Sequence, residues 1–187
     1  MRTRILAAGV ACLGRFGIDK TTVDDAAREA GVARATVYRH FPDGKDELIA
    51  QTIAWAVEQF FSELAAAVVD APDFPTLLER GLLHAHRAVE EHEVLQKVLE
   101  TEPERLLPQL TQSAPLVQVA VRGFLAERLK EERLRPGMDP DGAAAWLSRM
   151  VLSFIVAGGR WDLADPAEVR RLVREELLVP VLEAEDL

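Results

Sequence analysis

The sequence predicts an all-α protein with a small N-terminal three-helix domain and a larger helical domain behind it. Of the 187 residues, 49% are hydrophobic, with Ala, Leu and Val dominant, and only 6% are aromatic, a composition that favours helices. Apolar residues recur at helical spacing along most of the chain, and Gly and Pro punctuate that pattern. We therefore expect one domain over residues 1–46 and a second over residues 47–187.

The first expected helix covers residues 2–16. It has one apolar stripe, as a helix that packs on one side does, and Gly17 follows its last turn. The residues of the stripe are Ile5, Ala8, Cys12 and Phe16. This helix is placed to brace whatever follows it.

Two short helices joined by a tight turn come next. Thr22 is a good N-cap residue, and Asp25 three positions later completes a capping box. Gly31 ends this helix, because the position after a helix commonly needs a left-handed backbone. A third helix is expected over residues 33–41, with Val37 facing inward. Two helices joined in this way form a helix-turn-helix, which lays its second helix in a DNA groove.

The outer face of the third helix is rich in side chains that contact nucleic acid. Arg forks onto guanine, Ala and Thr methyl groups touch thymine, and Tyr and His suit phosphates. Residues expected to face bases are Arg34, Ala35, Thr36 and Arg39. Residues expected to hold phosphates are Thr22, Tyr38, His40 and Lys45. The alternative is a solvated polar helix on an ordinary bundle.

The run from Phe16 to Leu48, which contains TVYRHF and then KDEL, resembles the DNA-binding domain of TetR-family transcriptional regulators. The rest of the chain agrees with that family in length and helical pattern. The resemblance implies a homodimer that binds a pseudo-palindromic operator in double-stranded DNA, usually as a repressor. It also implies a small-molecule effector that releases the DNA.

The net charge of −9 is unevenly divided along the chain. Of the 22 basic and 31 acidic residues, 8 and 7 respectively fall within residues 1–50. The negative charge therefore belongs to the remainder, and the expected DNA-binding domain is close to neutral. A contact surface confined to a small part of the chain is compatible with this balance.

The larger domain begins with a long helix expected over residues 45–70. A fifth helix is expected over residues 73–92, and a seventh over residues 116–134. Between them, residues 94–115 are expected to form only short helices, because proline interrupts the helical hydrogen bonding. The interrupting residues are Pro103, Pro108 and Pro115.

Two C-terminal helices have clear starts at Asp139-Pro140 and Asp165-Pro166. The first, to about residue 158, is apolar on nearly all sides, so it needs a second partner. A twofold dimer supplies one, and it also presents two helix-turn-helix motifs to the DNA. The expected dimer interface comprises Trp146, Met150, Phe154, Ile155, Val169, Leu172, Val173 and Leu177. The alternative is a single internal core.

By the same resemblance, the effector pocket is expected among the fourth to seventh helices. Its expected apolar lining is Trp55, Phe60, Leu82, Ala85, Val89, Leu95, Val121 and Phe124, and Gly81 leaves room beside them. The few polar groups expected there are His84, His86, Arg87 and Arg122. This set is mostly apolar with few polar groups, which points to a hydrophobic ligand with at most one polar or charged end. The alternative is that these residues simply pack as core.

Several other classes of protein find no support in the sequence. A Gly-rich phosphate loop, a nucleophile elbow and a CxxC pair are all missing, so we expect neither an enzyme nor a bound cofactor. His84 and His86 are two apart on a helix and point in different directions, so no metal site is expected. The lone Cys12, with no secretory signal or membrane-spanning segment, predicts a cytoplasmic protein. The remaining alternative to a DNA-binding regulator is a helical adaptor that binds only proteins.

Overall fold

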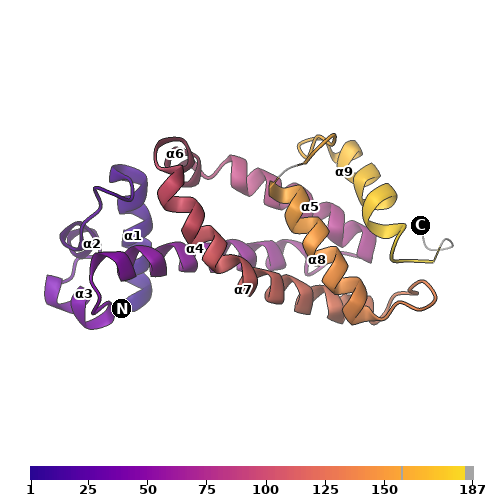
Figure 1. The fold of residues 1–187 in the computed structure, drawn as a ribbon, viewed down its shortest axis with the longest axis horizontal. Coiled ribbons are helices and arrows are strands. Elements are labelled where there is room, and N and C mark those ends of the chain that lie inside the picture. The colour runs from indigo at the N-terminus through magenta and orange to yellow at the C-terminus, as the bar shows by residue number, and fades with distance from the viewer. Residues whose placement is uncertain (157, 184–187) are drawn as a thin grey trace. The chain divides into compact units, whose positions relative to one another are not determined.

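The computed structural model describes residues 1–156 and 158–183, and over these residues the chain is built from helices (Figure 1). The only extended pairing among them is an isolated antiparallel bridge between Leu134 and Leu182. The prediction of an all-α fold is confirmed. The helices are α1 (Arg2–Phe16), α2 (Val23–Glu29), α3 (Arg34–His40), α4 (Lys45–Val68), α5 (Phe74–Glu90), α6 (Glu93–Thr101), α7 (Pro103–Leu129), α8 (Pro140–Val156), α9 (Pro166–Leu172) and the π-helix η1 (Val173–Leu178).

The chain folds into two compact units. We call the first the head unit, which consists of residues 1–60 and 89–114, and the second the body unit, which consists of residues 61–88 and 115–187. Both α4 and α7 contribute to each unit. This grouping by packing differs from the functional division expected after residue 46, which stays a prediction.

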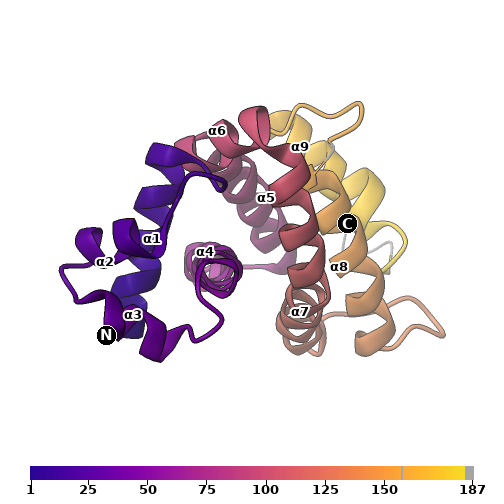
Figure 2. The same ribbon diagram turned by 60° about the vertical axis from the view of Figure 1, so that its left-hand side comes forward.

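A first apolar core of the head unit lies between α1, α2 and α3. Figure 2 shows these three helices beside α4. Ile5 of α1, Val37 of α3 and Phe41 after it are fully buried there. Thr22 accepts a hydrogen bond from the Asp25 amide at 3.1 Å, and the Asp25 carboxylate accepts one from the Thr22 amide at 3.1 Å. The predicted capping box is therefore confirmed.

The turn between α2 and α3 depends on Gly31. Its φ of 62° lies in the left-handed region, which side chains with a Cβ adopt only with strain. The Val32 amide then donates to the Ala27 carbonyl at 2.9 Å and satisfies one of the free carbonyls at the end of α2. The chain thereby leaves α2 and starts α3 within a few residues.

A second apolar cluster in the head unit joins α1 and α4 to α6 and the first turns of α7. Its buried members include Leu13, Ile49, Ile53, Val98 and Leu106. The α6 segment, more than 40 residues beyond the helix-turn-helix, therefore packs directly on the helices that support it.

The expected helix breaks at Pro108 and Pro115 were wrong, because α7 runs without interruption from Pro103 to Leu129. Pro103 does act as predicted, since it occupies the first position of α7, where a missing N–H has no consequence. Within the helix, the hydroxyls of Thr111 and Ser113 donate to the carbonyls four residues earlier. The division between the two units falls at Pro115, so this proline marks a boundary between units rather than a helix end.

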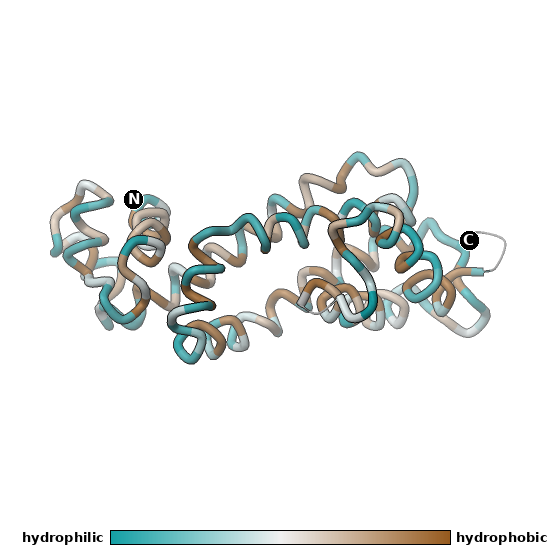
Figure 3. The backbone as a smooth tube through the Cα atoms, turned by 90° about the horizontal axis from the view of Figure 1, so that it is seen from above, coloured by the Kyte–Doolittle hydropathy of each residue, from teal (hydrophilic) through white to brown (hydrophobic). Residues whose placement is uncertain are grey.

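The body unit has a core formed by α5, α7, α8, α9 and η1. Its fully buried members include Leu82, Leu129, Leu147 and Leu172. Asp165 caps α9 by accepting a hydrogen bond from the Ala167 amide at 2.8 Å, as its position before proline predicted. Hydrophobic and hydrophilic residues alternate along the helices (Figure 3), and none of the described helices is both long and apolar enough to cross a bilayer.

Candidate DNA-binding surface and effector cavity

The face of α3 expected to contact DNA is open to solvent. Arg34, Ala35, Tyr38 and Arg39 are exposed, and Thr36 and His40 are half-buried. Val37, on the opposite face of the helix, has no exposed surface and anchors α3 in the head core. The helix therefore presents its polar residues outward on a rigid support, which is the arrangement that a recognition helix needs.

Arg34 is already engaged within the head unit. Its Nη1 donates to the Asp24 carboxylate at 2.8 Å, and its Nη2 donates to the Tyr38 hydroxyl at 3.3 Å. The hydrogen bond to Tyr38 and the charge of Asp24 raise the pKa of Arg34 above its ordinary value. Because Tyr38 accepts from Arg34, its own hydroxyl proton stays available for a phosphate oxygen. Asp24 is a residue that the sequence reasoning missed.

The two expected phosphate contacts outside α3 lie at helix N-termini. Thr22 is the exposed N-cap residue of α2, and Lys45 is the first residue of α4. Lys45 is half-buried, and its Nζ donates to the Asp19 carbonyl in the loop between α1 and α2 at 2.5 Å. Helix N-termini attract phosphate through their free N–H groups and dipole, so both positions suit an anionic backbone.

A cavity lies within the body unit between α4, α5, α7 and α8, with a volume of about 170 Å³. None of the side chains that line it carries a polar atom. They are Phe61, Leu64, Ala65, Val68, Leu77, Leu78, Gly81, Leu82, Ala120, Val121, Phe124, Leu125 and Val151.

Of the residues expected to line an effector pocket, Leu82, Val121 and Phe124 line this cavity, as does Gly81. Trp55 packs instead against the core of the head unit, and Ala85 is fully buried in the body core. Arg122 is exposed, and His84 and His86 are half-buried outside the lining, as are Phe60 and Val89. The cavity is lined by α4, α5, α7 and α8, so α6 takes no part in it, and the other expected residues lie outside its lining. The expected effector site stays a prediction.

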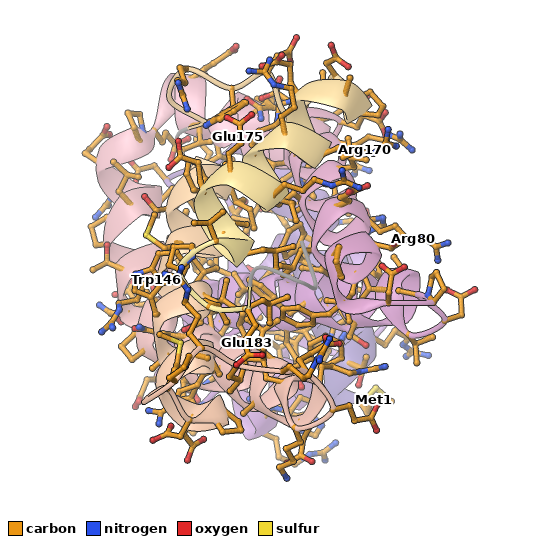
Figure 4. The ribbon with its side chains drawn as sticks, turned by 90° about the vertical axis from the view of Figure 1, so that its right-hand side faces the viewer. Met1, Arg80, Trp146, Arg170, Glu175 and Glu183 are labelled. Atoms are coloured by element: carbon orange, nitrogen blue, oxygen red, sulfur yellow. The ribbon has the colours of Figure 1, made fainter. Side chains whose placement is uncertain are left out.

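The residues expected at the dimer interface divide into two groups. Trp146, Met150, Phe154 and Ile155 of α8 are half-buried and pack in part against the body core. The other four, Val169, Leu172, Val173 and Leu177, have no exposed surface. Their apolar stripe faces the core of the chain itself, so we correct the expectation that they contact a second copy. The outward side chains of this segment are charged, as Arg170 and Glu175 in Figure 4 show.

The fold and the exposed α3 define a helix-turn-helix protein with a second helical unit that contains an apolar cavity. A family model described as "Bacterial regulatory proteins, tetR family" matches residues 5–52. The uncharacterized HTH-type transcriptional regulator Rv2250c of Mycobacterium tuberculosis is 30% identical over 149 residues, which cover 80% of this chain and 75% of that protein. The chain therefore belongs to the TetR family of transcriptional regulators.

Solved structures share this fold. A TetR-family regulator from Mesorhizobium loti superimposes with a TM-score of 0.66 at 18% identity, covering 97% of this chain and 96% of that one. SmeT, the repressor of the Stenotrophomonas maltophilia multidrug efflux pump SmeDEF, has been solved as a complex with triclosan. That complex matches with a TM-score of 0.58 at 26% identity, covering 100% of this chain and 93% of that one.

Proposed function

We propose that the protein is a ligand-responsive repressor that binds a pseudo-palindromic operator as a homodimer and acts by binding rather than by catalysis. The observation that carries the proposal is the outer face of α3, exposed above the buried anchor Val37, in a chain of this family. Chromosomal DNA as the partner would place its action in the cytoplasm.

Two kinds of DNA contact are proposed for the head unit. Arg39, Ala35 and Thr36 read base edges, together with Arg34 when its guanidinium leaves Asp24. Thr22, Tyr38, His40 and Lys45 hold phosphates and set the register of α3 in the groove. Phosphate contacts add affinity on every sequence, whereas base contacts add it on the operator alone.

The proposed effector is a neutral apolar molecule that occupies the cavity of the body unit. A buried carboxylate without a partner is strongly disfavoured, and the lining offers no polar side chain to pair with one. An apolar cavity of about 150 Å³ accommodates a molecule the size of benzene, so the volume of about 170 Å³ admits only a ligand of about that size unless the lining helices move. The SmeT complex with triclosan shows that a relative binds an organic compound.

Release of DNA requires that the effector favour one conformation over another, because equal affinity for both shifts nothing. A ligand larger than the cavity enters only when the lining helices move. One of these, α4, carries Leu64 and Val68 of the lining near one end and Lys45 at the other. We propose that the displaced α4 moves the head unit away from its DNA-binding position.

The proposed dimer interface is the exposed part of α8. Trp146, Met150 and Phe154 are spaced four residues apart and therefore lie along one face of that helix. All three are half-buried in the single chain, which leaves apolar surface for a second copy. The contribution of α9 and η1 would be polar, from residues such as Arg174.

The test begins with selection of binding sites from random-sequence duplex DNA, followed by titration of the selected site at several salt concentrations. We expect selected sites with twofold symmetry and an affinity that falls steeply as salt rises. An adaptor that binds only proteins would enrich no sequence and would show no specific complex. That result would overturn the proposal.

A further inference from the structure

Asp19, in the loop between α1 and α2, is held by three charged residues from two other parts of the head unit. Its amide donates to the Glu102 carboxylate at 2.9 Å. Its own carboxylate accepts from Nε and Nη2 of Arg105 at 2.8 and 2.7 Å. Its carbonyl accepts from Lys45 Nζ at 2.5 Å. Each polar group of Asp19 therefore has a separate partner, and Glu102 and Arg105 lie more than 80 residues away in sequence.

The neighbouring backbone is shaped to allow these contacts. Gly17 has a φ of 80°, and a Cβ at this position would overlap the Glu102 carboxylate. Lys97 of α6 donates to the Gly14 carbonyl at 2.6 Å, where the end of α1 leaves carbonyls without helical partners. The loop that precedes the helix-turn-helix is thus fastened by α6 and the start of α7.

We propose that Arg105 is a positioning residue for DNA binding that acts through Asp19 on Lys45. This inference rests on the proposed function, because it assumes that Lys45 contacts a DNA phosphate. With Asp19 fixed, its carbonyl takes one hydrogen of the Lys45 ammonium and leaves two for a phosphate oxygen. A side chain held in advance loses less conformational entropy when the DNA arrives.

The direction of the effect follows from the charges around Lys45. Asp19, Asp46, Lys45 and Arg105 all line a cavity of about 200 Å³, which gives the Lys45 side chain room to reorient. Without Arg105, the Asp19 carboxylate loses its partner while it still lines the same cavity as Lys45. The ammonium then pairs with that carboxylate instead of the phosphate, so the affinity for DNA falls.

The ion pair itself contributes little to folding. The side chains of Arg105 and Asp19 are 59% and 54% exposed, and ion pairs in water at such positions have small effects on stability. A variant that lacks Arg105 should therefore keep its fold. A change in its affinity for DNA can then be assigned to the position of the Lys45 side chain. The pair of Arg80 with Asp70, at 3.1 Å on the body unit, is a matched control.

The experiment measures the affinity of the full chain for its selected operator and for a random duplex, across a range of salt concentrations. We expect Arg105→Ala to weaken both duplexes by the same factor, about tenfold for the loss of one charge-assisted contact, and to lower the salt slope by about one. Arg80→Ala should leave affinity unchanged. The unfolding temperatures of both variants should match the unaltered chain.

A double-mutant cycle separates positioning from direct contact. In a chain that already carries Lys45→Ala, Arg105→Ala should have no further effect, because it acts only through Lys45. Adding Asp19→Asn to Arg105→Ala should restore most of the affinity, since it removes the competing carboxylate. Additive losses in the cycle, or normal binding by Arg105→Ala, would overturn the inference. If the unaltered chain bound no DNA, the proposed function itself would be wrong, whatever the role of Arg105.

Discussion

The head and body units use opposite means to make a functional surface. In the head unit, polar side chains of α3 stand outward, and a few local features (a capping box, Gly31 and the buried Val37) hold them there. In the body unit, the cavity is lined by apolar side chains from four helices. The DNA-binding surface therefore depends on a short stretch of sequence, whereas the cavity depends on how distant segments pack.

The largest expected effect tests the anchor of the head unit. Val37→Asp places a charge without a partner in the head core and should lower the free energy of unfolding by more than about 3 kcal/mol. Ala35→Asp, on the exposed face of the same helix, should keep the fold and weaken only DNA binding. Chemical denaturation compares the two variants. Equal stability would mean that α3 is not anchored through Val37.

The next largest effects, on folding and on dimer formation, are expected from substitutions in α8 and α9 of the body unit. Val169→Glu buries a charge in the core and should unfold the body unit, again at a cost above about 3 kcal/mol. Phe154→Glu changes a half-buried residue of α8, so it should give a folded monomer. Circular dichroism reports the folding, and sedimentation reports the mass. A folded dimer for Phe154→Glu would move the interface elsewhere.

A smaller effect is expected from the recognition helix itself. Arg39→Ala should relax preference at one base position of the operator, at a cost of roughly 1–3 kcal/mol on the preferred site. Random DNA should be bound almost as before, because the phosphate contacts remain. Binding to single-base variants of the operator measures this. An equal loss on operator and random DNA would assign Arg39 to the phosphates.

The smallest effect concerns the cavity. Gly81 lies within α5, where a Cβ would meet only Val68 Cγ1 at 3.8 Å, an ordinary contact distance. Gly81→Ala should therefore raise stability by about 1 kcal/mol through helix propensity, with operator affinity unchanged. Thermal unfolding and operator titration check the two parts. Destabilisation would mean that the glycine is needed for close packing.

The contrast between the units also explains what the sequence could predict. The capping box at Thr22, the turn at Gly31 and the outward face of α3 follow from spacings of a few residues, so they were predicted. The lining of the cavity was predicted only in part, because helical periodicity gives the apolar face of α5 but not which side of that face meets α7. Ala85 and Phe124 were both expected, yet only Phe124 lines the cavity.

Two other differences come from packing between distant segments. The apolar stripe of Val169 and Leu172 was expected to contact a partner chain. In the structure both side chains are buried in the body core. The contact of Arg105 with Asp19 joins residues that are 86 apart in the sequence, so no local sequence pattern predicts it. The proline rule also failed inside α7, because Pro108 and Pro115 both lie within one continuous helix.

The most direct test of the central claim, that the body cavity controls the head unit, is operator affinity measured with and without a cavity ligand. The ligand is a neutral apolar compound that raises the unfolding temperature of the protein; a carboxylate with the same hydrocarbon skeleton serves as its control. We predict that the neutral compound weakens operator binding and that the carboxylate does not. Gly81→Phe, which fills the cavity, should bind operator and ignore the compound. Unchanged operator affinity with the stabilising ligand bound would contradict the account.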